Sequence, residues 1–119
     1  MNNTSIISRL IYHDSTFLFT GDAEQETEEI ILENNIDVQA DVLKVGHHGS
    51  KTASSENFLN AVQAKKAVII CGVDNKFKHP HFITLYYLNK KNIEIFRTDQ
   101  DKTINCESSG VDINCQKML

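Results

Sequence analysis

Histidine and carboxylate side chains gather in three short polar segments of the sequence. The segments are Thr20–Asp22, Gly46–Ser50 and His79–His81, and the last two hold four of the five histidines. Imidazole nitrogens and carboxylate oxygens are common ligands of zinc, manganese and iron. A carboxylate such as Asp22 can also bridge two cations, as two-metal hydrolases require. These residue types therefore indicate a candidate divalent-metal site, with zinc or manganese as the expected ion.

Each segment also has a structural interpretation that assigns it no chemical role. Asp22 precedes a predicted helix and could be its N-cap. His47 and His48 are adjacent in a glycine-rich loop and could be surface residues without a ligand role. Gly46 and Gly49 in that loop would let the backbone turn sharply beside a metal.

The third segment, His79-Pro80-His81, looks like the start of the binuclear metal motif H-x-H-x-D-H. Ile83 and Thr84 stand where the aspartate and the last histidine would be required, so the segment is not that motif. His81 falls at a predicted helix start and is assigned a structural role. His79 is expected to reach a substrate.

The segments lie at the ends of predicted strands, where an α/β fold usually carries its functional residues. Period-two and period-3.6 patterns predict an order β-β-α-β-α-β-α-β-β-β, in which helices pack on a sheet. The predicted strands are 5–12, 16–20, 40–45, 67–72, 93–97, 103–107 and 111–115, and the predicted helices are 24–34, one opening at Ser54–Glu56 and one following His79–His81. Phe82, Leu85, Tyr86 and Asn89 form the helical stripe of the last helix, widened by Leu88.

Composition fits one domain and excludes several classes. The 119 residues are 40% hydrophobic and 24% charged, which excludes collagen and low-complexity disorder. The longest apolar run, 67–73, is far shorter than the about 20 residues of a membrane-spanning helix. The sequence start predicts no signal peptide.

Charge is divided unevenly along the chain. The net charge is −4, with seven acids and one base in residues 1–35 and nine acids and eleven bases in 36–119. The five glutamates of 24–33 are predicted to form a solvated helix face. A protein that binds nucleic acid without catalysis is disfavoured, because the charge is negative and no basic stripe interleaved with aromatics is evident.

Three cysteines, Cys71, Cys106 and Cys115, occur without C-x-x-C spacing. This predicts neither a zinc knuckle nor a disulfide scaffold. Cys71 is expected to be a buried small hydrophobe. Cys106 and Cys115 could pair only if their strands are adjacent, and a reducing cytoplasm is the default compartment.

Three stretches resemble the metallo-β-lactamase fold, and specifically its DNA-internalisation competence (ComEC-type) branch. They are Asn2–Leu10 with Phe17–Asp22, Ala40–Ser50 (A-D-V-L-K-V-G-H-H-G-S) and Lys78–His81. Thr-Gly-Asp alone is a weak signal, whereas L-K-V-G-H-H-G-S at this distance after it is specific. The resemblance extends from the first residues to about Asp112.

The resemblance implies an αββα sandwich and hydrolysis by a metal-activated water, with phosphodiester or nucleic-acid substrates and a role in DNA uptake. It makes Asp22 the bridging ligand and one histidine of the pair a ligand, assigned to His48, with His47 beside the site. His79 would line the pocket and assist the leaving group. Gly49 and Ser50 would contact substrate. Members of this branch can be attached to a membrane with the hydrolase domain outside.

The chain departs from the family in lacking H-x-H-x-D-H, the principal ligand motif of the first half of the fold. Two ligands do not fill a zinc site that usually takes three or four protein groups. Residues 1–119 are therefore interpreted as one domain of α/β (α+β) class, the second half of the αββα sandwich, with a mixed sheet and helices on one face. Alone it would be weakly active or inactive.

An apolar sheet face left by the missing half would need a second copy or a complementary first half to cover it. The alternative function is a non-catalytic module, derived from the same fold, that serves oligomerisation or partner binding. It predicts that Asp22→Ala and His48→Ala leave the behaviour of the protein unchanged.

Overall fold

The computed structural model describes residues 4–118 and confirms the predicted α/β class. Asn2 and Asn3, which open the first matching stretch, lie outside the described residues. The elements in chain order are β1 (Ser8–Tyr12), β2 (Ser15–Phe19), α1 (Gln25–Glu33), β3 (Val42–Lys44), η2 (Gly46–Gly49), α2 (Glu56–Val62), β4 (Lys66–Ile69), α3 (Phe82–Lys90), β5 (Glu94–Arg97), α4 (Thr98–Asp101), β6 (Ile104–Ser108) and β7 (Ile113–Lys117).

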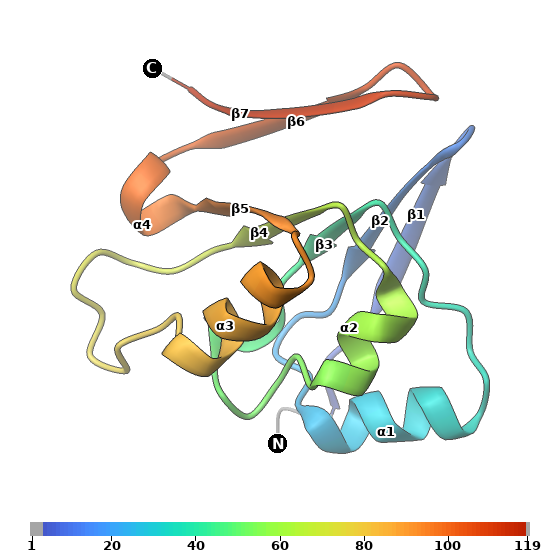
Figure 1. Cartoon of the computed structure of the whole chain (residues 1–119), viewed down its shortest axis with the longest axis horizontal. Coiled ribbons are helices and arrows are strands. Elements are labelled where there is room, and N and C mark those ends of the chain that lie inside the picture. Colours follow the sequence, from blue (N-terminus) through green and yellow to red (C-terminus); the bar gives the residue numbers. More distant parts are fainter. Residues whose placement is uncertain (1–3, 119) are drawn as a thin grey trace.

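A mixed five-stranded sheet forms the centre of the molecule (Figure 1). Its order is β1-β2-β3-β4-β5, with β1 antiparallel to β2 and the remaining pairs parallel. Helices α1, α2 and α3 lie on one side of this sheet and the β6–β7 hairpin lies on the other. Within residues 4–118, no helix has the length and apolar character needed to cross a membrane.

The side of the sheet toward the helices is a closed apolar core. Leu18, Leu43 and Ala67 are neighbours across β2, β3 and β4, and each is at most 1% exposed. Phe58 from α2 and Leu88 from α3 belong to the same buried cluster. Because side chains alternate along a strand, the neighbouring residues must point to the opposite side.

The opposite side, here called the outer face, carries Leu10, Phe17, Phe19, Lys44 and Val68 at adjacent register positions. Leu10 and Phe19 remain 53% and 45% exposed. The hairpin covers only part of this face, with Cys106 closing a small apolar cavity over Phe17, Phe19 and Val68.

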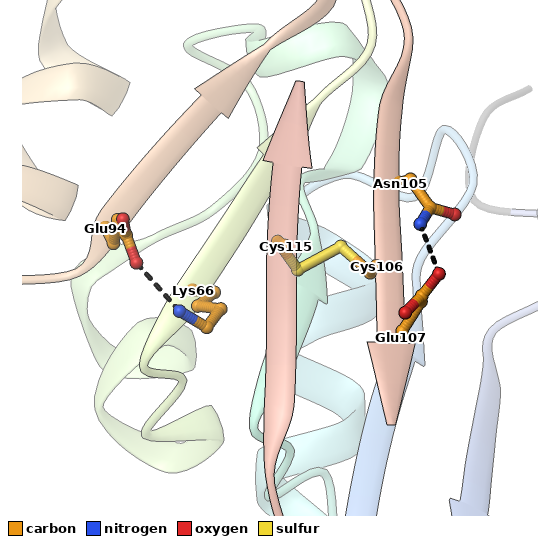
Figure 2. Close-up of a disulfide and its surroundings, with 6 residues drawn as sticks. All are labelled: Lys66, Glu94, Asn105, Cys106, Glu107 and Cys115. Atoms are coloured by element: carbon orange, nitrogen blue, oxygen red, sulfur yellow. Dashed lines mark hydrogen bonds and ion pairs between the residues drawn. A yellow bond between two sulfur atoms is a disulfide. The ribbon is translucent and has the colours of Figure 1, made fainter. Parts of the chain in front are cut away.

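Cys106 and Cys115 form a disulfide because their strands are adjacent, which is the condition on which their pairing was expected to depend. Cys106 and Cys115 stand directly opposite each other in the β6–β7 register, with Cα atoms 4.0 Å apart, and their sulfurs are bonded (Figure 2). Ser109 and Asp112 fix the turn that sets this register: the Ser109 N–H donates to the Asp112 carbonyl at 3.0 Å. The reducing cytoplasm was a default in the absence of an oxidising signal, and it stays a prediction.

Three smaller expectations are corrected. Cys71 is half-buried at the edge of the core rather than enclosed in it. Glu24, without a side-chain cap bond, is the N-cap of α1 in place of Asp22. The buried stripe of α3 centres on Thr84 and Leu88, whereas the predicted stripe members Phe82 and Tyr86 are 73% and 55% exposed.

Candidate functional site

The three polar segments meet at one edge of the sheet. They follow β2, β3 and β4, whose carboxyl ends lie at the same edge because these strands are parallel. A cavity of about 390 Å³ opens there, lined by Asp22, Glu24, His47, His48, Ser50, Thr52, Phe77 and His79. The position matches the usual place of a ligand site in an α/β sheet.

Asp22 and His48 are neighbours in the lining of this cavity. The Oδ1 atom of Asp22 lies 3.5 Å from Nε2 of His48. The other ring nitrogen of His48, Nδ1, is 2.7 Å from the Ile70 carbonyl oxygen, which can only accept, so Nδ1 carries the proton. When His48 carries a single proton on Nδ1, its Nε2 is free and faces Asp22, the arrangement typical of a metal-ligating histidine.

His47 points to a different set of partners. Its Nδ1 lies 3.8 Å from a carboxylate oxygen of Glu24 and 3.4 Å from the Thr52 hydroxyl oxygen. Its ring meets that of His79 edge-on, with centroids 5.9 Å apart. The two adjacent imidazoles thus diverge, His48 toward Asp22 and His47 toward Glu24 and His79.

The backbone of the histidine pair explains this divergence. His47 and His48 both adopt left-handed conformations, with φ of 49° and 56°. Two consecutive left-handed residues other than glycine cost about 1–2 kcal/mol each. Conformations of this cost persist only where the surrounding structure holds them, as the bond of His48 to the Ile70 carbonyl does here.

Two glycines allow the loop to sit where it does. A Cβ on Gly46 would lie 3.0 Å from the Thr20 hydroxyl, and one on Gly49 would lie 2.6 Å from a Pro80 carbon. The sharp turn that was expected at the glycines lies instead at His47 and His48, together with Gly49, which is also at positive φ. Gly46 permits the loop to approach the Thr20–Asp22 segment closely.

His79 also lines the cavity and is an uncharged base at neutral pH. Burial lowers the pKa of His79, and repulsion from His47, His48 and His81 acts in the same direction. His81 points elsewhere: its Nδ1 accepts from the Ile83 N–H at 3.2 Å and caps α3.

The sequence analysis missed one residue that positions the site. Glu28 was assigned to a solvated face, yet it is 2% exposed. Its two carboxylate oxygens accept from the Ser54 N–H at 2.6 Å and the Ser55 N–H at 2.9 Å. Burial raises the pKa of Glu28, with these N–H groups acting in the opposite direction. Glu28 thereby ties α1 to the end of the histidine loop. It stands three residues before the buried Ile31, on the same helix face, and this spacing is the signal that could have marked it.

Of the six residues predicted for the site, the structure brings five around the cavity: Asp22, His47, His48, Ser50 and His79. Gly49 is outside the lining residues and packs on Pro80. The Ser50 side chain is mostly buried and its hydroxyl bonds with that of Thr52 at 2.9 Å.

The residues present fit a divalent cation only in part. Asp22 and His48 offer a facing oxygen and nitrogen, and His48 is oriented as a ligand. Among residues 4–118, no group of three or more His, Cys, Asp or Glu side chains is placed to hold a metal ion. Asp22 and His48 therefore provide two ligands of a metal site, and the other described residues do not complete its coordination.

Comparison with known proteins agrees with the fold. The family model described as Metallo-beta-lactamase superfamily matches residues 1–73, which include Asp22 and both loop histidines. The chain belongs to the metallo-β-lactamase superfamily.

Within that superfamily its relatives are competence proteins, as the resemblance predicted. The chain is 40% identical over 103 residues to ComE operon protein 3 of Bacillus subtilis and 35% identical over 99 residues to competence protein ComA of Neisseria gonorrhoeae. It is 41% identical over 76 residues to recombination protein 2 of Haemophilus influenzae. These matches cover 87%, 82% and 64% of this chain but only 13%, 14% and 9% of the relatives.

Proposed function

We propose that this chain is the second half of a metal-dependent hydrolase domain, with Asp22 and His48 as two of the ligands of a zinc or manganese centre. The observation that carries the proposal is the 3.5 Å approach of Asp22 Oδ1 to His48 Nε2, with His48 held by the Ile70 carbonyl. When bound, a divalent cation supplies a Lewis acid and activates water for attack.

The residues around the pair have separable roles in this proposal. Uncharged His79 lines the same cavity, where it can exchange a proton with the leaving group. His47, held between Glu24 and Thr52, binds substrate beside the ligands. The substrate class is a phosphodiester or nucleic acid, which the names of the relatives, competence and recombination proteins, support.

The two-ligand geometry predicts weak or no hydrolysis by the chain alone. The test mixes the chain with a polypeptide that carries the H-x-H-x-D-H half of the fold and follows release of nitrophenol from bis-nitrophenyl phosphate with added zinc or manganese. Activity is expected only in the mixture, and Asp22→Asn should abolish it. An equally active Asp22→Asn mixture would refute the proposal.

A second function, partner binding without catalysis, is favoured by the outer face of the sheet. Leu10, Phe19 and Ile70 are each about half exposed, because the hairpin covers this face only in part. A second copy or the complementary half would cover this face. If Phe19→Lys abolishes association in solution while Asp22→Ala and His48→Ala have no effect on association or on any activity, this function is the correct one.

A further inference from the structure

The loop between β4 and α3 presents an aromatic ring at the rim of the cavity. Phe77 is 68% exposed and lines both the 390 Å³ cavity and an adjoining one of about 250 Å³ that also contacts His48 and His79. Its ring is stacked on that of His79, with centroids 5.7 Å apart and planes 24° from parallel. A planar ligand lying on Phe77 would therefore be directed at the reactive residues.

The loop is braced internally, so this presentation does not depend on a ligand. The side-chain amide of Asn75 donates to the Gly72 carbonyl at 3.0 Å and to the His79 carbonyl at 2.7 Å. The carbonyl oxygen of the same amide accepts from the His79 N–H at 2.8 Å. A surface fixed in advance loses less conformational entropy when it binds.

Two lysines flank the ring. Lys76 and Lys78 are both exposed, and Nζ of Lys76 lies 5.0 Å from the centre of the Phe77 ring. Asp74 is the one acid in residues 73–79. Asp22 and Glu24 also line this cavity, so a polyanion would be attracted to the two lysines beside Phe77 rather than to these carboxylates.

We propose that Phe77, Lys76 and Lys78 form a nucleotide-binding subsite that feeds single-stranded nucleic acid into the cavity. An unpaired base stacks on Phe77, and the two lysines contact the flanking phosphates. Base stacking on an aromatic ring is stronger than an exposed cation–π contact, so the base displaces the Lys76 ammonium from the ring and frees it for phosphate. Only a single strand offers an unstacked base to such a protruding ring. This inference rests on the proposed hydrolytic function of the same cavity.

The test is fluorescence anisotropy of a labelled oligothymidylate with the full chain and a chelator present. Phe77→Ala should weaken binding about tenfold, as expected for loss of one base stack, whereas Phe77→Trp should retain it. Phe82→Ala is the matched control: Phe82 is 73% exposed, on α3, and lines neither cavity, so its removal should have no effect. Changing both lysines to alanine should lower the salt slope by about 1.4, the value for two phosphates on a single strand.

Three outcomes would overturn the subsite: no oligonucleotide binding by the wild type, equal losses in Phe77→Ala and Phe82→Ala, or equal affinity for duplex. The chelator separates this proposal from the hydrolytic one. Phe77-dependent binding by a chain that takes up no zinc would support the subsite and contradict the proposed hydrolase. Zinc uptake without Phe77-dependent binding would support the hydrolase and contradict the subsite.

Discussion

The two faces of the five-stranded sheet differ in how deeply their side chains are buried, and the difference is visible between neighbouring residues of one strand. Leu18, toward the helices, is 1% exposed, while its neighbour Phe19, on the outer face, is 45% exposed. The inner face is a completed core, with Leu43 and Ala67 fully enclosed. The outer face has aromatic and aliphatic residues of the same kind but only a hairpin across part of it. The contrast indicates that one face supplies the stability of this chain and the other is available to a partner.

The largest expected effect is a matched pair of substitutions on the two faces. Leu18→Ala should lower the free energy of unfolding by about 2–5 kcal/mol, because it leaves a cavity in the enclosed core. Leu10→Ala, at a position 53% exposed on the outer face, should lower it by about 0.5 kcal/mol. Urea denaturation measures both, and equal losses would show that the outer face is already covered.

The next effect concerns the hairpin that partly covers the outer face. A two-stranded hairpin is marginally stable by itself. Removing the cross-link that spans nine residues, by Cys106→Ser with Cys115→Ser, should destabilise the hairpin by about 2–3 kcal/mol. Hydrogen exchange should become faster in β6 and β7 while β3 and α2 stay protected. Cys71→Ser is the control, and a uniform loss of protection would contradict independent faces.

A smaller effect is expected from the one buried carboxylate on the helix side. Glu28→Gln replaces one of two accepting oxygens by an amide that cannot accept, leaving the N–H of Ser54 or Ser55 unpaired. The cost should be about 1–3 kcal/mol in the free energy of unfolding. Glu29→Gln, on the exposed face of the same helix, is the matched control and should be nearly neutral.

Glu28 also predicts a pH dependence. Its pKa is raised in the folded state above the ordinary value of 4.5, so the folded protein holds this proton more tightly than the unfolded chain. The stability that it contributes is therefore complete below pH 4.5 and is lost as the pH rises through the folded pKa. The Glu28→Gln variant should lack this component; an unchanged pH profile would show that Glu28 does not titrate in this window.

The order of strands and helices was predictable because it depends on local periodicity. The order of elements, the opening hairpin and the cavity edge followed from runs such as Phe17–Thr20 and from the polar segments at strand ends. The disulfide was not predictable, since it depends on the register that the 109–112 turn imposes on two terminal strands. Glu28 was missed because glutamates are expected on the solvated face, although its position three residues before Ile31 places it on the buried one.

The features of the site also fall into those that the sequence predicts and those that depend on the folded backbone. Residue types and spacing predicted that Asp22 and the His47–His48 pair belong to one site, and the resemblance assigned His48. The parallel strands β2 and β3 bring Asp22 and His48 together. The divergence of His47 from His48 depends on two left-handed backbone conformations that no composition signal reveals. Phe77 was overlooked because Lys76-Phe77-Lys78 is too short a run to form a basic stripe interleaved with aromatics.

The central claim is that Asp22 and His48 are metal ligands, and zinc binding by titration calorimetry tests it most directly. His48→Asn and His13→Asn make the same change at left-handed positions with φ of 56° and 52°, where asparagine is tolerated, one inside the cavity and one outside. We predict weak but measurable zinc binding by the wild type and His13→Asn, and at least about tenfold weaker binding by His48→Asn, as for loss of one ligand. Equal affinities in the two variants, or no zinc binding by the wild type, would contradict the claim.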